Sequence, residues 1–355
     1  MVLRALSIPI SPPGLAWIAG ATLTSPVTIG STETWASALP PGRGDVNGVG
    51  SAWTAIDYPK IQSTGLTVGL SGLMGPSSRS EIFRDGLLEG RVVVVSGAGT
   101  GLGRAATLEM VGLGATVIGC ARRPEPLEET ASMAEALPGS FEHSTLDIRD
   151  EEAVDAFFDE IVGRHGRIDT LVNNAGGQFL SPAEAISPKG FRTVVELNVT
   201  GTWLMTHAAA TKAFIPQGGG AVLSVTLSPH NGMPGMVHSG AARAAVENMM
   251  RTLATEWARF GIRTCALAAG QFTTESFVNK YPKEVVEAID RTIPMGRAGR
   301  EEEMAWLIAF LTSDAGAFHS GSVITIDGGR DNWFGQFPPP AFTGGGEDIP
   351  AESRD

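Results

Sequence analysis

Cysteine is scarce in this chain, with two residues in 355. Cys120 and Cys265 both fall inside apolar, strand-like runs, and neither has a second cysteine or a histidine nearby at metal-ligand spacing. Buried free thiols suit a reducing compartment better than a disulfide does. We therefore expect a cytoplasmic protein with no disulfide and no zinc or other metal site.

Basic charge and long apolar runs are also in short supply. Acidic side chains outnumber basic ones by 38 to 26, a formal net charge of -12 at pH 7, which disfavours nucleic acids and anionic membranes as partners. Because no run of about 18 uncharged apolar residues occurs, we expect no membrane span. The first residues faintly resemble a signal peptide, but Pro9, Pro12 and Pro13 interrupt their apolar patch, so we do not expect secretion.

Residues 1–80 lack the sustained hydrophobic periodicity of a helix or a strand. They are rich in glycine, serine, threonine and proline, and such a segment cannot bury enough apolar surface to offset its ordering entropy. We expect a low-complexity, disordered leader here, with the hypothesis that the biological start is Met74. A second irregular segment, rich in proline and glycine, is expected at residues 334–355.

Between residues 81 and 333, strand-like and helix-like segments alternate. "RVVVVSG" at 91–97 is a continuous apolar run, typical of a parallel strand buried on both faces. Further strands are expected at 116–121, 141–148, 168–176, 221–227, 262–270 and 321–327, and helices up to about 113 and at about 125–137, 151–166, 188–214, 238–260 and 301–313. This order predicts one α/β domain, a Rossmann-type doubly wound parallel sheet of about seven strands with helices on both faces.

A glycine-rich turn, "SGAGTGLG", follows the first strand and precedes a helix, the context in which this pattern binds a dinucleotide. Gly97 permits the tight turn, Gly101 lets the backbone approach the pyrophosphate, and Gly103 lets helix and strand pack closely. The free N–H groups and the positive end of the helix then hold the phosphates. The residues expected in this part of the coenzyme site are Gly97, Gly99, Thr100, Gly101, Leu102 and Gly103.

The end of the second strand indicates which coenzyme is used. Enzymes that use NAD usually have an aspartate or glutamate here for the ribose hydroxyl. This chain has "CARRPE", with Arg122 and Arg123, and guanidinium groups can grip a 2′-phosphate bidentately. The sequence therefore predicts NADP(H), with one of the two arginines as a solvated surface charge.

These motifs, together with "LVNNAGG", "ELNVTG" and "ITIDGG", resemble the short-chain dehydrogenase/reductase superfamily over residues 88–329. Within it, "NNAGGQFLSPAEAISPKGF" and "VHSGAARAAVENMMRTLATEWARFGIR" resemble the peroxisomal-type trans-2-enoyl-CoA reductases, with the 2,4-dienoyl-CoA reductases as neighbouring relatives. The resemblance implies NADPH-dependent reduction of a carbon–carbon double bond in an acyl-CoA thioester, by a homodimer or homotetramer. The final "AESRD" is not a peroxisomal address of the Ser-Lys-Leu type, so we do not carry over the peroxisomal location.

The resemblance also implies coenzyme contacts at three further strand ends. The residues are Asp147 and Ile148 at the adenine ring, Asn174, Ala175 and Gly176 after the fourth strand, and Gly270, Phe272 and Thr274 at the carboxamide. Where the family usually has a Pro-Gly turn, this chain has Ala269-Gly270, and we expect a looser turn there. Asn198, in "ELNVTG", should lie near the nicotinamide ribose and the catalytic residues.

The helix expected to carry the family's catalytic Tyr-x-x-x-Lys pair has no tyrosine. It reads "VHSGAARAAV", which places Ser239 at the tyrosine position and Arg243 at the lysine position. Their i,i+4 spacing keeps both side chains on one helical surface. The chain's two tyrosines, Tyr58 and Tyr281, lie outside this helix.

The missing tyrosine favours one reaction over another. Reducing a ketone requires a proton donor of tuned pKa for the alkoxide, and neither serine nor arginine supplies one near neutral pH. When hydride adds to Cβ of a 2-enoyl thioester, the charge collects on the thioester oxygen, where hydrogen-bond donors can stabilise the enolate. We therefore expect a trans-2-enoyl-CoA reductase, with Asn198, Ser239 and Arg243 around the enolate and Arg243 also on the coenzyme ribose.

Other candidates and readings stay open. By the same resemblance, Ser228 falls where the dienoyl-CoA reductases place a tyrosine, which disfavours a dienoyl substrate, and its hydroxyl is a further candidate for the site. His238 is a candidate acid or substrate contact, with His207 and His230 weaker. The structural alternatives are small-residue packing for Ser239, capping of a helix turn for Asn198 and a hydrogen-bonded core imidazole for His238. The functional alternatives are a 3-oxoacyl-CoA or ring-keto thioester reductase and a catalytically silent NADP-binding scaffold.

Overall fold

A parallel sheet of seven strands forms the centre of the protein. The computed structural model describes residues 82–228, 230–280, 283, 286 and 289–333. The strands are β1 (Val92–Ser96), β2 (Thr116–Ala121), β3 (Ser140–Thr145), β4 (Thr170–Asn173), β5 (Gly220–Leu227), β6 (Ile262–Ala269) and β7 (Val323–Ile326), in the spatial order β3-β2-β1-β4-β5-β6-β7. All six neighbouring pairs are parallel, which confirms the predicted doubly wound sheet. The expected leader and tail, the suggested start at Met74 and both tyrosines lie outside the described residues.

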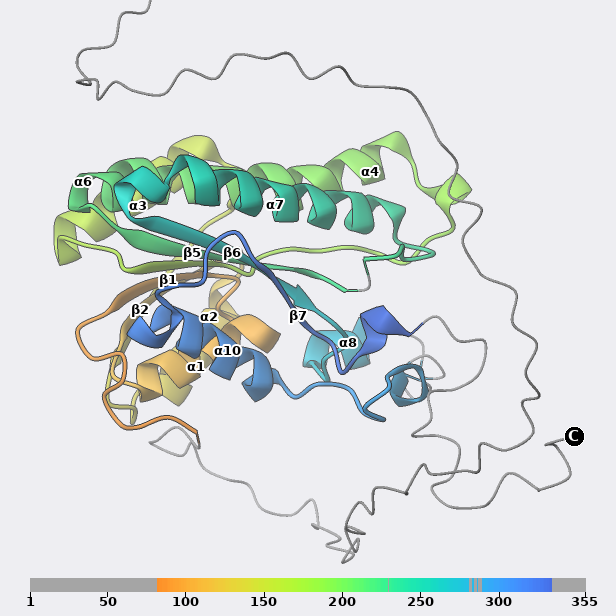
Figure 1. Ribbon diagram of the computed structural model, residues 1–355, viewed down its shortest axis with the longest axis horizontal. Helices are drawn as coiled ribbons and strands as arrows, with labels where there is room; N and C mark the ends of the chain where they lie inside the picture. Colours follow the sequence, from red (N-terminus) through yellow and green to blue (C-terminus); the bar gives the residue numbers. More distant parts are fainter. Residues whose placement is uncertain (1–81, 229, 281–282, 284–285, 287–288, 334–355) are drawn as a thin grey trace, which may run out of the picture. The chain divides into compact units, whose positions relative to one another are not determined.

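Helices cover both faces of this sheet (Figure 1). They are α1 (Gly101–Gly112), α2 (Pro124–Ala134), α3 (Glu151–His165), α4 (Pro188–Val195), α5 (Gly201–Ala209), α6 (Ile215–Gln217), α7 (Val237–Glu256), α8 (Glu275–Lys280) and α10 (Glu301–Thr312). α1, α2 and α10 lie on one face, and α3 to α7 on the other. Side chains alternate along β1, so that Val93 and Val95 pack toward the first face and Val92 and Val94 toward the second.

The residues at the two ends and on the buried face of α3 explain why this segment forms a helix. Asp150 caps its start, because the carboxylate accepts a hydrogen bond from Ala153 N at 3.1 Å, and Gly166 ends it with φ of +72°. Between these ends the buried residues recur at helical spacing and face the sheet: Val154, Phe157, Phe158 and Ile161.

The chain is helical throughout the region predicted at 188–214, but the helix geometry changes within it. Two π-helical segments interrupt it, at Glu196–Thr200 and Ala210–Phe214, between α4, α5 and α6. A π turn accommodates one extra residue without ending the helix, so hydrophobic periodicity alone does not reveal it. Asn198 lies in the first π segment, which gives its side chain a different direction from that in a regular helix.

Two predicted strands are shorter than expected at the cleft end. β3 ends at Thr145 instead of residue 148, and β4 ends at Asn173 instead of residue 176. β3 ends where β2 ends, at the pair Thr145–Ala121, whereas β4 ends at the pair Asn173–Ser224 while β5 continues to Leu227. As a result, the residues expected to meet the coenzyme lie on loops at the carboxyl edge of the sheet.

Both cysteines are free and buried, as predicted. In the part of the chain that the structure describes, no helix is long and apolar enough to cross a bilayer.

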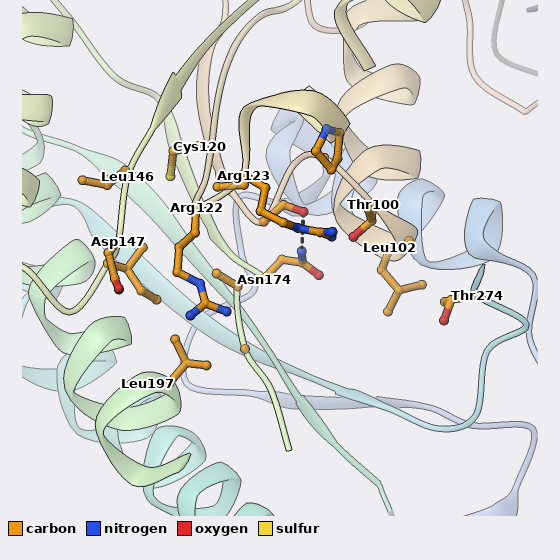
Figure 2. A pocket seen from close by; sticks show the side chains of 18 residues that line it. Thr100, Leu102, Cys120, Arg122, Arg123, Leu146, Asp147, Asn174, Leu197 and Thr274 are labelled. Atoms are coloured by element: carbon orange, nitrogen blue, oxygen red, sulfur yellow. Dashed lines mark hydrogen bonds between the residues drawn. The ribbon is translucent and has the colours of Figure 1, made fainter. Parts of the chain in front are cut away.

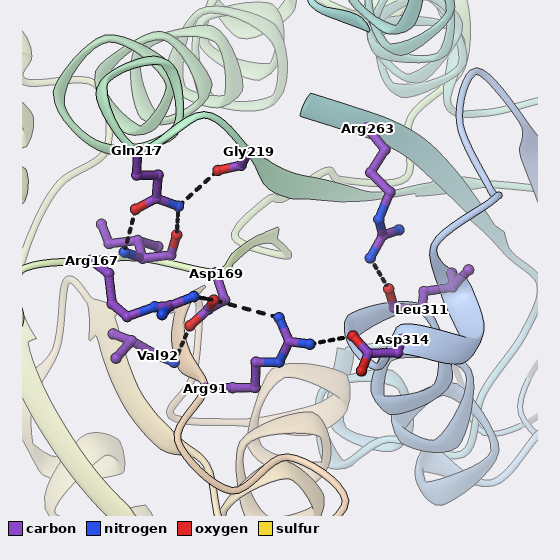
Figure 3. A network of polar contacts seen from close by, with 10 residues as sticks. Arg91, Val92, Arg167, Asp169, Gln217, Gly219, Arg263, Leu311 and Asp314 are labelled. Atoms are coloured by element: carbon purple, nitrogen blue, oxygen red, sulfur yellow. Dashed lines mark hydrogen bonds and ion pairs between the residues drawn. The ribbon is translucent and has the colours of Figure 1, made fainter. Parts of the chain in front are cut away.

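A buried carboxylate organises the opposite, amino-terminal edge of the sheet (Figure 3). Asp169 is 7% exposed, and its Oδ2 accepts a hydrogen bond from Val92 N at 2.8 Å. Its Oδ1 accepts from the guanidinium groups of Arg91 and Arg167. Arg91 also pairs with Asp314, so that one aspartate joins the starts of β1 and β4 to the segment after α10.

We expect Asp169→Ala to lower the free energy of unfolding by about 3 kcal/mol, because it leaves a backbone N–H and two guanidinium groups without their shared acceptor. Asp314→Ala is the matched control, since Asp314 pairs with Arg91 from a side chain that is 93% exposed and solvent screens that pair. Urea unfolding of both variants without coenzyme measures the difference. Equal losses in the two variants would show that Asp169 has no special role.

Candidate functional site

A cleft of about 660 Å³ opens at the carboxyl ends of β1, β2, β3 and β4 (Figure 2). Thirteen of the sequence-predicted coenzyme residues line it: Gly97, Gly99, Thr100, Gly101, Leu102, Arg122, Arg123, Asp147, Ile148, Asn174, Ala175, Gly176 and Thr274. The sequence analysis missed five others: Cys120, Ala121, Pro126, Leu146 and Leu197. Cys120, Ala121, Pro126 and Leu146 match no quoted coenzyme motif, and Leu197, although it lies in "ELNVTG", had no predicted role, so only the fold identified them.

The turn between β1 and α1 is built on glycines whose missing side chains make room. Gly97 has φ of +72°, and a Cβ there would stand 2.8 Å from Asn174 Nδ2. At Gly103 a Cβ would stand 2.1 Å from the Gly97 carbonyl oxygen. Gly103 does not line the cleft, but its close packing brings the start of α1 against the end of β1.

The first turn of α1 faces the cleft, and no described residue accepts a hydrogen bond from its first backbone N–H groups. The side chain of Thr100, the N-cap residue, forms no capping hydrogen bond, and the first turn contains no acidic residue. The first N–H groups of a helix have no partner within the helix, and the helix dipole adds positive charge at this end. The turn therefore suits a phosphate group.

Side chains of α1, α2 and the loop after β4 hold the glycine-rich turn in place. Arg104 Nε donates a hydrogen bond to the Gly99 carbonyl oxygen at 2.9 Å. Thr130 Oγ1 lies 3.3 Å from the Ala98 carbonyl oxygen, and Asn174 Nδ2 donates to the Gly97 carbonyl oxygen at 3.2 Å. Arg104 and Thr130 were not among the predicted site residues; the Arg104 contact with Gly99 is local, whereas Thr130 reaches Ala98 only once α2 packs beside α1.

Two arginines lie at the far end of the cleft, and both side chains are exposed. Within the described residues, neither Arg122 nor Arg123 forms an ion pair, so both guanidinium groups are available to a ligand. Asp147 is already engaged, because Arg149 Nε donates to its carboxylate at 2.9 Å. This hydrogen bond is the main reason that the pKa of Asp147 lies below its usual value, with the charge of Arg122 adding to the effect.

These features together fit a dinucleotide coenzyme. The glycines leave space that a Cβ would fill, the helix start offers unpaired donors, and the arginines offer unpaired positive charge.

The three coenzyme contacts predicted after β6 differ in whether their side chains reach the cleft. Thr274 lines the cleft, and its hydroxyl accepts a hydrogen bond from Phe277 N at 3.0 Å. Phe272 is 5% exposed and turns its ring into the core against Gly299, so only its backbone could face a ligand. Gly270 packs against Asp327, where a Cβ would stand 2.5 Å from the aspartate Cβ. The structure thus brings one of these three residues to the cleft lining.

Asn198 is fully buried and holds the loop that follows β4. Its Nδ2 donates to the Gly177 carbonyl oxygen at 2.8 Å and to the Val194 carbonyl oxygen at 2.7 Å, while its Oδ1 accepts from Gly177 N at 3.2 Å. Both the N–H and the C=O of Gly177 are therefore fixed by one side chain. Asn198 is placed to position the loop.

The same loop meets α7 at the Ser239 and Arg243 positions. Ser239 is fully buried, and its Oγ donates to Gln178 Oε1 at 3.3 Å. Arg243 Nη1 donates to the Val225 carbonyl oxygen at 2.7 Å. A Cβ on Gly176 would stand 2.3 Å from Arg243 Nη2. Successive residues of the loop thus contact Arg243, Asn198 and Ser239 in turn.

The guanidinium group of Arg243 has no carboxylate partner among the described residues. Burial lowers its pKa to about 10, so it remains a cation at neutral pH. Because Nη1 is used by Val225, the other nitrogens are free to bind a coenzyme or substrate oxygen.

Gln178 is a site residue that the sequence analysis missed. Its Oε1 accepts a hydrogen bond from the Ser239 hydroxyl, and its Nε2 has no hydrogen-bond partner in the described part of the chain. An amide in this state still has donors to offer. The available signal was its place in "NNAGGQF", since a polar residue two positions beyond the predicted strand end lies at the cleft edge of a parallel sheet.

Two predicted catalytic candidates have other surroundings. Ser228 Oγ donates to Asp327 Oδ2 at 2.5 Å, which turns its hydroxyl toward the segment after β7. His238 is fully buried with its ring 4.3 Å from that of Phe179, and within the described residues both ring nitrogens are enclosed without a hydrogen-bond partner. The structure groups Ser239, Arg243 and Asn198 but does not add these two side chains to them.

Residues 97–331 match the protein-family model described as "Enoyl-(Acyl carrier protein) reductase". The chain is 36% identical over 265 residues to a protein of Caenorhabditis elegans named probable 2,4-dienoyl-CoA reductase 3, which covers 73% of this chain and 86% of that protein. It is also 36% identical over 256 residues to a probable 2,4-dienoyl-CoA reductase of Bacillus subtilis (strain 168), covering 71% of this chain and all of that protein (100%).

Relatives named for other reactions are similar as well. The chain is 35% identical over 243 residues to the 3-oxoacyl-(acyl-carrier-protein) reductase FabG of Thermotoga maritima, covering 68% of this chain and 98% of that protein. Among solved structures, the citronellol catabolism dehydrogenase AtuB of Pseudomonas aeruginosa PAO1 has a TM-score of 0.64 at 39% identity, covering 70% of this chain and 98% of that one.

Proposed function

Because the chain belongs to the short-chain dehydrogenase/reductase family of oxidoreductases, which use a nicotinamide coenzyme, we propose that it reduces the carbon–carbon double bond of a trans-2-enoyl-CoA thioester with NADPH. One observation carries this proposal. The loop after β4 presents Gln178 to Ser239 while Asn198 holds Gly177, which groups hydrogen-bond donors at the position where the family has a tyrosine acid.

The reaction places charge where these donors can act. A bound nicotinamide coenzyme supplies the hydride that forms the new C–H bond at Cβ. The π electrons of the double bond then shift toward the carbonyl, and negative charge collects on the thioester oxygen. Donors fixed in advance around that oxygen stabilise this charge. Cα then takes a proton, from water or from a nearby group, and this completes the product.

Ser239 and Gln178 are the two donors assigned to the thioester oxygen. Their mutual hydrogen bond, at 3.3 Å, is longer than the usual 2.7–2.8 Å between hydroxyl and oxygen, so a substrate oxygen can replace it. The Ser239 hydroxyl and the Gln178 amide would then both point at the substrate. Arg243 binds the coenzyme ribose and adds positive charge to the site.

Exposed apolar side chains next to Ser239 and Gln178 suit an acyl chain. Phe179, Leu180 and Val237 have large apolar side chains that are 41%, 54% and 50% exposed. Phe179 and Leu180 directly follow Gln178, and Val237 precedes Ser239 by two residues. We assign these side chains to the acyl tail of the thioester.

The proposed coenzyme is NADP(H). The end of β2 has no acidic residue for a ribose hydroxyl, and Arg122 and Arg123 are exposed and free of ion pairs within the described residues. A 2′-phosphate would occupy both sets of donors. The cytoplasmic location and the homodimer or homotetramer stay predictions.

We expect Arg122→Ala or Arg123→Ala to lower the ratio of kcat/KM with NADPH to kcat/KM with NADH by about 10- to 100-fold, because charge-assisted hydrogen bonds to the 2′-phosphate are lost. Activity with NADH should hardly change. Arg259→Ala is the matched control, since Arg259 is exposed and lies over the Phe260 ring after α7. If neither cleft variant changed the ratio, the coenzyme assignment would be wrong.

A substrate panel tests the reaction. Purified protein is mixed with NADPH and, separately, with a 2-enoyl-CoA, a 2,4-dienoyl-CoA and a 3-oxoacyl-CoA, and NADPH oxidation and the products are recorded. We expect turnover of the 2-enoyl-CoA. The 2,4-dienoyl-CoA is included because two of the relatives are named 2,4-dienoyl-CoA reductases. The thioester oxygen of this substrate collects negative charge in the same way.

The similarity to a 3-oxoacyl reductase supports the second candidate, a carbonyl reductase. Turnover of the 3-oxoacyl-CoA alone would replace the proposed reaction with this one. Tight NADPH binding with no turnover of any thioester would instead favour a catalytically silent scaffold.

A further inference from the structure

Two segments that are far apart in the sequence meet beyond the carboxyl ends of β5 and β7. One is the loop that leads from Ser228 to α7, and the other is the segment that follows β7. Ser228 Oγ donates to Asp327 Oδ2 at 2.5 Å, and Asn231 Nδ2 donates to the Asp331 carbonyl oxygen at 3.3 Å. The loop is thus fastened to the segment at two points.

His230 forms the centre of this contact. Its backbone N donates to Asp331 Oδ1 at 2.6 Å, and its ring Nδ1 lies 2.5 Å from Asp331 Oδ2. On the other side of the ring, Nε2 lies 3.0 Å from Glu247 Oε1, in a side chain of α7 that is 6% exposed. Asp331 is itself held by Asp327, whose Oδ2 accepts its N–H at 2.7 Å. An imidazole with a carboxylate at each nitrogen satisfies both only when both nitrogens carry a proton.

The surrounding charges favour that protonated form. Burial by itself would lower the pKa of His230, but the hydrogen bond to Asp331 and the charges of Glu247 and Asp331 together raise it above its usual value. Two further cations share these carboxylates. Arg251 Nη2, on α7, is 3.9 Å from Glu247 Oε2, and Arg330 acts on Asp331.

Through backbone hydrogen bonds, the two segments also contact the stretch between β6 and α10 and the loop that carries Gln178. Met295 N, in the stretch between β6 and α10, donates to the Gly328 carbonyl oxygen at 3.1 Å. Ser181 N, in the loop that carries Gln178, donates to the Gly235 carbonyl oxygen at 2.9 Å. The loop that His230 anchors then runs directly into the first turn of α7, which carries Ser239.

We propose that His230 is a positioning residue, which as an imidazolium joins Glu247 to Asp331 and holds the β5–α7 loop against the segment after β7, so that the mouth of the substrate site keeps its shape. We call this group, Ser228, His230, Glu247, Asp327 and Asp331, the His230 clamp. Its predicted effect on substrate binding rests on the proposed function, whereas its effect on the loop does not.

The clamp predicts a pH dependence with a definite sign. Since the pKa of His230 is raised in the folded protein, the clamp is complete below the ordinary histidine pKa and is lost as pH rises through the raised value. KM for the 2-enoyl-CoA should therefore be low below the ordinary histidine pKa and increase as pH rises through the raised pKa of His230. In His230→Gln, KM should be about tenfold higher with kcat within about twofold, and should no longer follow pH.

Two further variants separate positioning from general damage. His230→Lys restores a cation with several donors. In this variant KM should return toward the wild-type value and should not increase over the pH range in which the wild-type KM increases. His143→Gln is the matched control, because His143 is an exposed histidine on β3 and stacks only on Phe141 among the described aromatic rings. It should leave KM and its pH profile unchanged.

Two measurements test the clamp without activity. The His230 Cε1–H resonance, identified among six histidines by its loss in His230→Gln, should titrate above the ordinary histidine value. Amide hydrogen exchange at residues 230–240 and 327–333 should be faster in His230→Gln than in the wild type at pH 6.5 or below.

The outcomes are distinguishable. An ordinary or lowered His230 titration, or unchanged exchange in His230→Gln, would overturn the clamp. So would thioester turnover with an unchanged KM in that variant. If no thioester is turned over but the titration and exchange behave as expected, the proposed function fails and the clamp stands.

Discussion

Replacing Ser239 by alanine is expected to lower kcat for a 2-enoyl-CoA about 100-fold, because it removes one of two fixed donors to the developing enolate. The Kd for NADPH should stay within about twofold, since Ser239 contacts Gln178 and not the cleft lining. Steady-state kinetics with NADPH and a 2-enoyl-CoA measure the first quantity, and NADPH fluorescence measures the second.

The control for this change lies on the same helix. Thr252→Val removes an exposed hydroxyl of α7, which donates to the Asn248 carbonyl oxygen, and should leave kcat unchanged. A Ser239→Ala variant with wild-type kcat would remove Ser239 from the mechanism and support the packing alternative.

Gln178 gives a second test of the same pair. Gln178→Ala should also lower kcat by about 100-fold, and the double variant should lose less than the product of the two single losses, because residues that act as a unit are not additive. Fully multiplicative losses would mean that the two side chains act on separate steps.

The second large effect is expected at Gly103→Ala. The new Cβ would stand 2.1 Å from the Gly97 carbonyl oxygen and 2.4 Å from Asn174 Nδ2, and neither atom can retreat without moving β1 or its neighbouring loop. α1 must shift outward, which takes its first N–H groups away from the phosphates. A displacement of about 1 Å is enough to raise the Kd for NADPH about 100-fold. The overpacking should also lower the free energy of unfolding by about 2 kcal/mol.

Gly112→Ala is the matched control for Gly103→Ala. Gly112 is in the same helix, and a Cβ there would meet no heavy atom within 4 Å. The variant should bind NADPH normally and be equally or slightly more stable, because alanine restricts the unfolded chain. Calorimetric titration with NADPH and thermal unfolding measure both properties. Equal coenzyme affinities in the two variants would show that the close contact at Gly103 does not position α1.

The sequence predicted the fold class and the succession of strands along the chain, because each strand and its following turn depend on nearby residues. Seven apolar runs gave the seven strands, and the glycine pattern gave the turn at β1. The region predicted as helix at 188–214 is helical but contains π segments such as Glu196–Thr200, and the strands predicted at 141–148 and 168–176 end early. Periodicity reports which face of a segment is apolar, but a π turn and the end of a strand both depend on neighbouring elements.

Sequence patterns did not predict which side chains Ser239 and Ser228 contact. Ser239 and Arg243 were expected from one helix, but Gln178, which pairs with Ser239 across 61 residues, was not. Ser228 was expected beside them, and the structure pairs its hydroxyl with Asp327, which is 99 residues away. The spacing of a motif fixes the helical face on which a side chain lies, but the partner on that face comes from another segment.

The sequence by itself therefore determined the coenzyme half of this protein. A buried strand, a glycine turn and a helix start are contiguous, so their backbone geometry is set locally by residues such as Gly97 and Gly103. Only the tertiary structure decided the partners of Ser239, Ser228 and His230. Their hydrogen bonds join loops that leave different strands, and the order in which those strands pair in the sheet determines which loops lie close enough to touch.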